Sequence, residues 1–182
     1  MENHVCPWWV GYLLISPLRS LLHPPKDVVG PYVRPGMTVM DVGCGMGFFT
    51  IPMAAMVGEQ GHVIAVDMQE RMLKALRKRA TRSGLAHRIR IHRCEPDRLG
   101  IDGPVDFILA FHMVHEVPNP KRLFSEFRSL LNAGGTVLYA EPSFHVTGPR
   151  FNELLRIAEE AGLMPVRDVN VRWSHTKLLG LP

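Results

Sequence analysis

The sequence predicts an α/β fold with one sheet that is parallel through five strands and finishes in an antiparallel hairpin. Strand and helix signals alternate from residue 38 to residue 161, as in folds whose parallel strands are joined by helices. A turn with glycine at every second position, Gly43-Cys44-Gly45-Met46-Gly47, joins the first strand to its helix. The last two strand-like runs are separated by one residue. Strands joined so tightly must be antiparallel, because a parallel return needs a long crossover.

Each element follows from a local pattern. In chain order we expect a short helix at 26–33, a strand at 38–42, a helix at 47–57, a strand at 62–66, a helix at 69–83, strands at 88–94 and 105–111, a helix from 120, a strand at 136–140, a helix from 148 to 161, and strand-like runs at 164–172 and 174–179. The nearly continuous apolar run 105–111 is typical of a central parallel strand covered on both faces. Asn119 and Thr147 are expected helix N-caps.

Composition is that of a globular domain. The 182 residues are 46% hydrophobic and 21% charged, with a net charge of +4, so anionic partners are allowed but not required. Cys6, Cys44 and Cys94 lie far apart without a CxxC pair, which argues against a disulfide framework and fits a reducing compartment. The apolar run 8–15 is shorter than the ~20 residues that span a bilayer and lacks the flanks of a secretion signal. We therefore expect a cytoplasmic protein.

An acid at the end of the second strand completes a nucleoside-binding pattern. Asp67 follows twenty-four residues after Gly43, and in βαβ units such an acid accepts the hydroxyls of a ribose. A dinucleotide fingerprint would place a third glycine at Phe48. Asp41, directly ahead of the turn, would repel a pyrophosphate but suits a ligand that has an ammonium group. The pattern therefore favours an amino-acid-bearing nucleoside over a dinucleotide.

These motifs, in this order, resemble those of the class I S-adenosylmethionine-dependent methyltransferases. The resemblance covers roughly residues 25–182 and depends on Asp41 to Gly47, Asp67, 106–112, 131–138 and Glu141-Pro142. Within that superfamily the chain is similar to the small-molecule branch (methyltransferase type 11) that contains quinone-biosynthesis C-methyltransferases. The resemblance implies a Rossmann-like fold with a seven-stranded, mostly parallel sheet, an antiparallel C-terminal hairpin and helices on both faces. It also implies S-adenosylmethionine as the cofactor.

Cofactor-binding positions follow from the resemblance. They are Asp41, Gly43, Cys44, Gly45, Gly47, Asp67, Met68, Glu95, Pro96 and Phe111. The glycine turn would line the methionine portion, with Cys44 a small loop residue rather than a nucleophile. Asp67 would bind the ribose diol and Met68 would pack on the adenine. Glu95 falls where the family has an acid facing the adenine amino group. Pro96 departs from the pattern because it lacks an N–H, so that contact with the adenine is missing or comes from Asp97.

The acceptor side is predicted from the strand ends. Methyl transfer from a sulfonium needs an aligned nucleophile, and a general base only where the nucleophile arrives protonated. His112, directly after the fourth strand, is the best candidate base, with a structural histidine as the alternative. His115, Glu141 and His145 are further substrate-side candidates, and His115 with Glu116 is also expected to brace the next turn. No metal is expected, because the nine histidines show no recognised zinc spacing.

Residues 1–24 form a segment ahead of the methyltransferase domain, which is predicted at 25–182. The aromatic residues Trp8, Trp9 and Tyr12 predict a lid that closes over an apolar acceptor and excludes water, so they are substrate-side candidates. Packing of this segment on the sheet and shallow contact with a membrane surface are the alternatives.

The leading functional hypothesis is methyl transfer to a small, apolar or aromatic molecule. Ten of the 21 Lys and Arg residues lie between Arg71 and Arg98, which would suit an RNA methyltransferase. On the 69–83 helix, however, these cations lie opposite the apolar stripe, and no aromatic residue is interleaved with them for base stacking. A solvated face is therefore favoured over a nucleic-acid footprint. A non-catalytic module that binds the cofactor is the third hypothesis.

Overall fold

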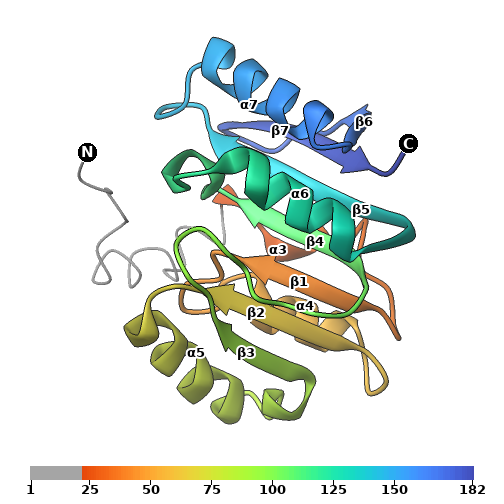
Figure 1. Cartoon of the computed structure of the whole chain (residues 1–182). Coiled ribbons are helices and arrows are strands. Elements are labelled where there is room, and N and C mark those ends of the chain that lie inside the picture. The colour runs from red at the N-terminus through yellow and green to blue at the C-terminus, as the bar shows by residue number, and fades with distance from the viewer. Residues whose placement is uncertain (1–21) are drawn as a thin grey trace.

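A computed structural model describes residues 22–182, which form one sheet with helices around it (Figure 1). The strands are β1 (Thr38–Val42), β2 (His62–Asp67), β3 (Ile89–Arg93), β4 (Val105–Phe111), β5 (Leu131–Pro142), β6 (Met164–Asp168) and β7 (Ser174–Gly180). The helices are α3 (Pro25–Val29), α4 (Thr50–Met56), α5 (Glu70–Arg82), α6 (Pro120–Leu130) and α7 (Gly148–Glu160), with 3-10 turns η1 (Ala86–Arg88) and η2 (Val114–Glu116).

The seven strands of this region lie in the order β3-β2-β1-β4-β5-β7-β6. Strands β1 to β5 pair in parallel, whereas β7 is antiparallel to both β5 and β6. The predicted fold class is thereby confirmed. The chain adds strands to one side of β1 and then crosses to β4 on its other side. In open α/β sheets a ligand crevice lies outside the carboxyl ends of the strands at such a reversal.

Two apolar layers cover the two faces of the sheet. Alternate residues of a strand point to opposite faces, so Val39 packs in the layer with α3, α4 and α5, and Met40 packs in the layer with α6 and α7. Figure 1 shows α6 and α7 in front of the sheet, with α4 behind it. Because both faces are covered, β4 is buried along almost its whole length, as its apolar run predicts.

Side-chain caps begin α6 and α7. Asn119 Oδ1 accepts a hydrogen bond from the Arg122 N–H at 3.0 Å, and Thr147 Oγ1 accepts one from the Arg150 N–H at 3.4 Å. Both predicted N-caps are therefore confirmed. Each satisfies an N–H that has no partner within its helix.

The predicted bounds of β5 are wrong. This strand begins at Leu131, because Leu131 pairs with Val105 before the register shifts and Thr136 pairs with Phe107. It also extends past Ala140 to Pro142, through antiparallel pairing with β7. Both extensions come from partners far away in the sequence.

The run predicted at 164–172 is also shorter than expected, because β6 ends at Asp168. The turn before β7 needs residues of its own: the Ser174 N–H bonds to the Val171 carbonyl at 3.1 Å, and Trp173 adopts a left-handed conformation with φ 56°. The predicted aromatic segment with Trp8, Trp9 and Tyr12 lies outside the described residues. Within 22–182, no helix has the length and apolar character needed to cross a bilayer.

Candidate active site

The glycine turn lies at the carboxyl end of β1. Gly43, Gly45 and Gly47 all have positive φ, at 71°, 53° and 83°, a region that residues with a Cβ rarely adopt. The Gly43 and Cys44 N–H groups donate to the Val66 carbonyl at 2.9 and 3.0 Å. These bonds tie the turn to the end of β2, beside Asp67.

Close packing holds the turn in place on two sides. A Cβ at Gly47 would overlap Leu76 Cδ1 of α5, so the helix that follows β2 packs directly against the turn. A Cβ at Gly43 would lie 3.0 Å from Met113 Cβ, in the segment after β4. The turn is thus fixed between the β2 and β4 sides of the sheet.

The Asp67 carboxylate is oriented by main-chain donors. Its Oδ2 accepts from the Gly45 N–H and its Oδ1 from the Gln69 N–H, both at 2.8 Å. Burial raises the pKa of Asp67, and hydrogen bonds from the N–H groups of Gln69, Gly45 and Met68 oppose that rise. Each carboxylate oxygen can accept a second hydrogen bond. A fixed pair of acceptors suits the vicinal hydroxyls of a ribose.

A second carboxylate, Asp41, lies under the same turn. It is 3% exposed, and Thr50 Oγ1 donates to its Oδ2 at 2.5 Å. Burial raises the pKa of the Cys44 thiol well above its ordinary value, and the negative charges of Asp41 and Asp67 add to the rise. A thiol that stays protonated is a poor nucleophile, which agrees with a small loop residue at Cys44. Two carboxylates at one end of the site favour a cationic ligand.

One cavity of about 540 Å³ joins this turn to the segments after β3, β4 and β5. The predicted site residues that line it are Asp41, Gly43, Cys44, Gly45, Asp67, Met68, Glu95, Pro96, Phe111, His112, His115 and His145. Gly47 and Glu141 are not in its wall: Gly47 packs against α5, and Glu141 is fully buried. Sequence reasoning missed Gln69, Leu99, Met113, Glu126 and Phe144, which also line the cavity. Gln69 and Met113 directly follow predicted residues, a signal that could have found them.

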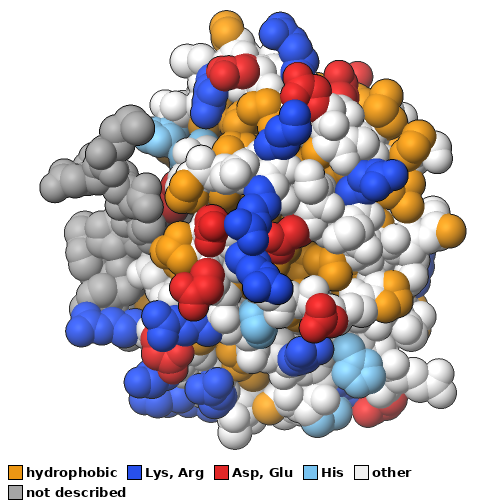
Figure 2. Space-filling model, in the orientation of Figure 1, with side chains coloured by type: hydrophobic (Ala, Val, Ile, Leu, Met, Phe, Trp, Pro, Cys, Tyr) orange, Lys and Arg blue, Asp and Glu red, His pale blue; other side chains and the backbone are white. Residues whose placement is uncertain are grey.

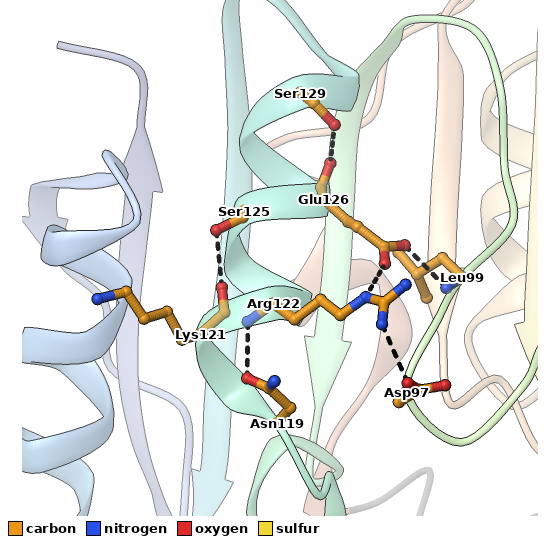
Figure 3. A network of polar contacts seen from close by, with 8 residues as sticks. All are labelled: Asp97, Leu99, Asn119, Lys121, Arg122, Ser125, Glu126 and Ser129. Carbon is orange, nitrogen blue, oxygen red and sulfur yellow. Dashed lines mark hydrogen bonds and ion pairs between the residues drawn. The ribbon is translucent and has the colours of Figure 1, made fainter.

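Helix α6 holds the loop between β3 and β4 in place (Figure 3). Glu126 Oε2 accepts from the Leu99 N–H at 2.8 Å, and its Oε1 lies 3.4 Å from Arg122 Nε. Arg122 Nη1 in turn donates to Asp97 Oδ2 at 3.0 Å. This loop includes Glu95 and Pro96, so the α6 side chains position the part of the wall predicted to face adenine.

The structure explains the proline in this loop. The Arg98 N–H donates to the Glu95 carbonyl at 3.4 Å, and the Glu95 N–H donates to the Arg98 carbonyl at 3.1 Å. Glu95 to Arg98 is therefore a four-residue turn with Pro96 at its second position, where proline is favoured because its φ is preset. Pro96 therefore has a structural role in this loop, which is separate from the question of which N–H contacts the adenine ring.

His112 is held at the tip of β4. Its φ is 60°, uncommon for a residue with a Cβ, and its N–H donates to the Ala140 carbonyl at 2.8 Å. His112 Nε2 lies 2.8 Å from Ser174 Oγ, and its ring stacks on Phe111 with centroids 4.0 Å apart. Both rings line the cavity.

His115 is bound by Glu141 from the neighbouring strand. Its main-chain N–H donates to Glu141 Oε1 at 3.0 Å, and its Nδ1 lies 2.6 Å from Glu141 Oε2. Burial lowers the pKa of His115, but the hydrogen bond that its ring donates to Glu141 and the charges of Glu141 and Glu116 outweigh burial and raise the pKa. The His145 ring packs edge-on against His115 at 4.9 Å. Glu141, predicted to face the rim, thus reaches the cavity only through His115.

The basic residues between Arg71 and Arg98 do not form one free surface. Arg79 donates to the Met46 carbonyl and Arg88 pairs with Glu59. The remaining cations of α5 are on its exposed side, visible at the lower left of Figure 2. This arrangement agrees with a solvated face. Among residues 22–182, no group of three histidine, cysteine or acidic side chains is placed to hold a metal ion.

The strand order, the glycine turn and the acid that ends β2 together define the class I methyltransferase fold. A family profile described as a methyltransferase domain matches residues 34–170, and the chain belongs to this family. The solved structure of an S-adenosylmethionine-dependent methyltransferase from Aquifex aeolicus has a TM-score of 0.86 at 26% identity, covering 96% of this chain and 98% of that one. The predicted family, enzyme class and cofactor are confirmed.

Curated relatives are similar over the same region. The ubiquinone biosynthesis O-methyltransferase of Xanthomonas campestris pv. campestris is 31% identical over 131 residues, which is 71% of this chain and 54% of that protein. The demethylmenaquinone methyltransferase of Listeria monocytogenes is 30% identical over 111 residues, or 61% of this chain and 47% of that protein. The chain therefore spans about half the length of these relatives.

Proposed function

We propose that this protein transfers the methyl group of S-adenosylmethionine to a small, apolar or aromatic molecule by in-line displacement. The observation that carries the proposal is the single 540 Å³ cavity, which the glycine turn and Asp67 share with histidine and aromatic side chains. A methyl donor held on one side would face an acceptor on the other, with water largely excluded.

The residues of the first side fit the cofactor. Asp67 offers two oriented acceptors to the ribose diol, and Asp41 with the glycine turn would receive the methionine portion. Met68 and Glu95 line the part of the cavity assigned to adenine. When bound, S-adenosylmethionine supplies an activated methyl group, while the protein binds, aligns and shields it.

Two features support an aromatic acceptor. The relative from Xanthomonas campestris is named for ubiquinone biosynthesis, and the one from Listeria monocytogenes is named as a demethylmenaquinone methyltransferase. On the acceptor side, Phe144 lines the cavity although it is 82% exposed, so it extends an apolar surface beyond the rim. Residues 1–24, with Trp8, Trp9 and Tyr12, would cover this opening as a lid.

Calorimetric titration with S-adenosylmethionine tests the cofactor site. Asp67→Ala is expected to weaken binding by about 2–3 kcal/mol, because hydrogen bonds to a charged group are lost. Asp168→Ala is a matched control, since this acid is 90% exposed at the edge of the sheet. Parent affinity in Asp67→Ala would contradict the ribose assignment. Uptake of a nicotinamide or flavin coenzyme with no affinity for S-adenosylmethionine would overturn the whole proposal.

Truncation tests the lid. Deleting residues 1–20 is expected to leave cofactor affinity measurable while release of S-adenosylhomocysteine with a catechol acceptor falls. Unchanged turnover would contradict the lid and favour plain packing of the segment. S-adenosylhomocysteine release by the full chain would also rule out a non-catalytic binding module.

A further inference from the structure

We propose that His115 and Glu141 form the general-base pair of this site, and that the acceptor atom is an oxygen that arrives protonated, as in a phenol or catechol. The inference rests on the proposed methyl transfer and assigns its acceptor chemistry. His115 is the catalytic residue and Glu141 a positioning residue.

The geometry of the pair fixes the proton on one ring nitrogen. Glu141 is fully buried, and both of its oxygens are bound to His115, Oε1 to the main-chain N–H and Oε2 to Nδ1 at 2.6 Å. A carboxylate only accepts, so Nδ1 carries the hydrogen and the lone pair of the neutral ring is on Nε2. This is the same division of roles as in a Ser-His-Asp triad, where a buried acid sets the tautomer of the base.

His115 shares its cavity with the residues assigned to the methyl donor. Met113, two residues earlier, packs on the glycine turn so closely that a Cβ at Gly43 would be 3.0 Å from it. Met113 and His115 line the same cavity as Asp41. An acceptor bound against His115 would thus occupy the same cavity as the glycine turn.

The second histidine of the wall is arranged differently. His112 Nε2 lies 2.8 Å from a hydroxyl, Ser174 Oγ. Ser174 Oγ also donates to the Arg172 carbonyl at 3.4 Å, and a hydroxyl adds no charge beside the ring. The buried Glu141 carboxylate both fixes the tautomer of His115 and adds a negative charge beside its ring, as a general base needs.

The charges around His115 set the direction of its titration. Glu141 faces it from β5, Glu116 Oε1 lies 3.8 Å from its Nε2, and the His145 ring packs on it from the segment after β5. Burial lowers the pKa of His115, and the two acids outweigh burial and raise it above 6.5. A base must be neutral to work, so turnover should fall as the pH drops through this raised pKa.

The step balances without a further reactant. The acceptor O–H bond breaks and its proton goes to His115 Nε2. The oxygen electron pair forms the bond to the methyl carbon, while the pair of the broken carbon–sulfur bond stays on sulfur. The ring later releases the proton to water.

The first test measures the pKa of the His115 ring directly and does not depend on turnover. Histidine NMR titration of the full chain is expected to show the pKa of His115 above 6.5 in the parent. In Glu141→Gln the pKa should fall, because the largest raising influence is removed while burial remains. His87→Gln is a matched control at an exposed site and should leave the titration unchanged. A His115 pKa that is the same in parent and Glu141→Gln would overturn the pairing.

The second test compares two acceptors at pH 8. Catechol arrives protonated, whereas 4-nitrocatechol arrives largely ionised because its nitro group acidifies the hydroxyl. His115→Gln is expected to lose roughly 100-fold or more in kcat with catechol, as for removal of a general base, but only a few-fold with 4-nitrocatechol. In Glu141→Gln, the pH below which kcat with catechol falls should be lower than in the parent.

The outcomes separate this inference from the proposed function. Equal losses on both catechols in His115→Gln would show a structural role and overturn the general-base assignment. If the parent binds S-adenosylmethionine but methylates neither catechol, the hydroxyl acceptor is wrong while the methyltransferase proposal stands. Failure of the parent to bind S-adenosylmethionine would contradict the proposed function itself.

Discussion

Replacing Gly47 by alanine tests how tightly the glycine turn is packed. Gly47 has φ 83°, and a Cβ there would overlap Leu76 Cδ1, a side chain that is 0% exposed in the core. Gly45, two residues earlier, has φ 53° and nothing within 4 Å of its would-be Cβ. The two positions therefore share the backbone strain and differ in the steric overlap.

The expected magnitudes follow from this difference. A left-handed alanine costs about 1–2 kcal/mol, so Gly45→Ala should lose about that much free energy of unfolding. Overfilling a packed core costs about 1–3 kcal/mol more, so Gly47→Ala should lose about 2–5 kcal/mol. At about 2–4 °C per kcal/mol for a chain of this size, the melting temperatures of the two variants should be clearly separated.

Urea denaturation of both variants, with the slope checked for two-state behaviour, measures the difference. The same substitution in a Leu76→Ala background removes the overlap, so Gly47→Ala should there cost only the backbone strain of about 1–2 kcal/mol. If Gly47→Ala is no less stable than Gly45→Ala, then α5 does not hold the turn, and the packing argument fails.

Two further predictions concern other parts of the site. Glu126→Ala should speed amide exchange at Leu99 and lower stability by about 1–3 kcal/mol, since a charged acceptor is lost, whereas Ser129→Ala, which removes only an exposed bond to the Glu126 carbonyl, should do neither. The raised pKa of His115 means that its pairing with Glu141 stabilises the fold fully below pH 6.5 and loses this effect as the pH rises through the raised value. The stability lost in Glu141→Gln should therefore be larger at pH 6 than at pH 9, and a pH-independent difference would argue against the ion pair.

The cofactor side was predictable because its signals are local. The turn from Gly43 to Gly47 needs positive φ, and Asp67 ends a strand whose apolar run is plain in the sequence. Backbone conformation and strand periodicity act over a few residues, so they leave a contiguous pattern. The two N-caps were predictable for the same reason. Pro96 departs visibly from the family pattern, but the hydrogen bonds that close the turn from Glu95 to Arg98 are not apparent from the sequence.

The acceptor side was predicted only as a set of candidates. His115 and Glu141 are twenty-six residues apart, and they meet because β5 lies beside β4 and extends two residues past Ala140. That extension depends on pairing with β7, where Glu141 lies opposite His175. Non-local pairing of this kind leaves no periodicity near either residue. Sequence reasoning therefore favoured His112, the residue closest to the strand tip.

The division of the site also follows from the strand order. The turn follows β1 and Asp67 ends β2, on one side of the reversal. On the other side, His115 is in η2 after β4, and Glu141 is in β5. The parallel ladder between β1 and β4 sets the distance between the two halves. We therefore expect Glu141→Gln, a change in the acceptor half, to leave cofactor affinity unchanged. Loss of cofactor affinity in Glu141→Gln would show that the halves are coupled through the glycine turn and Met113 rather than only joined by the sheet.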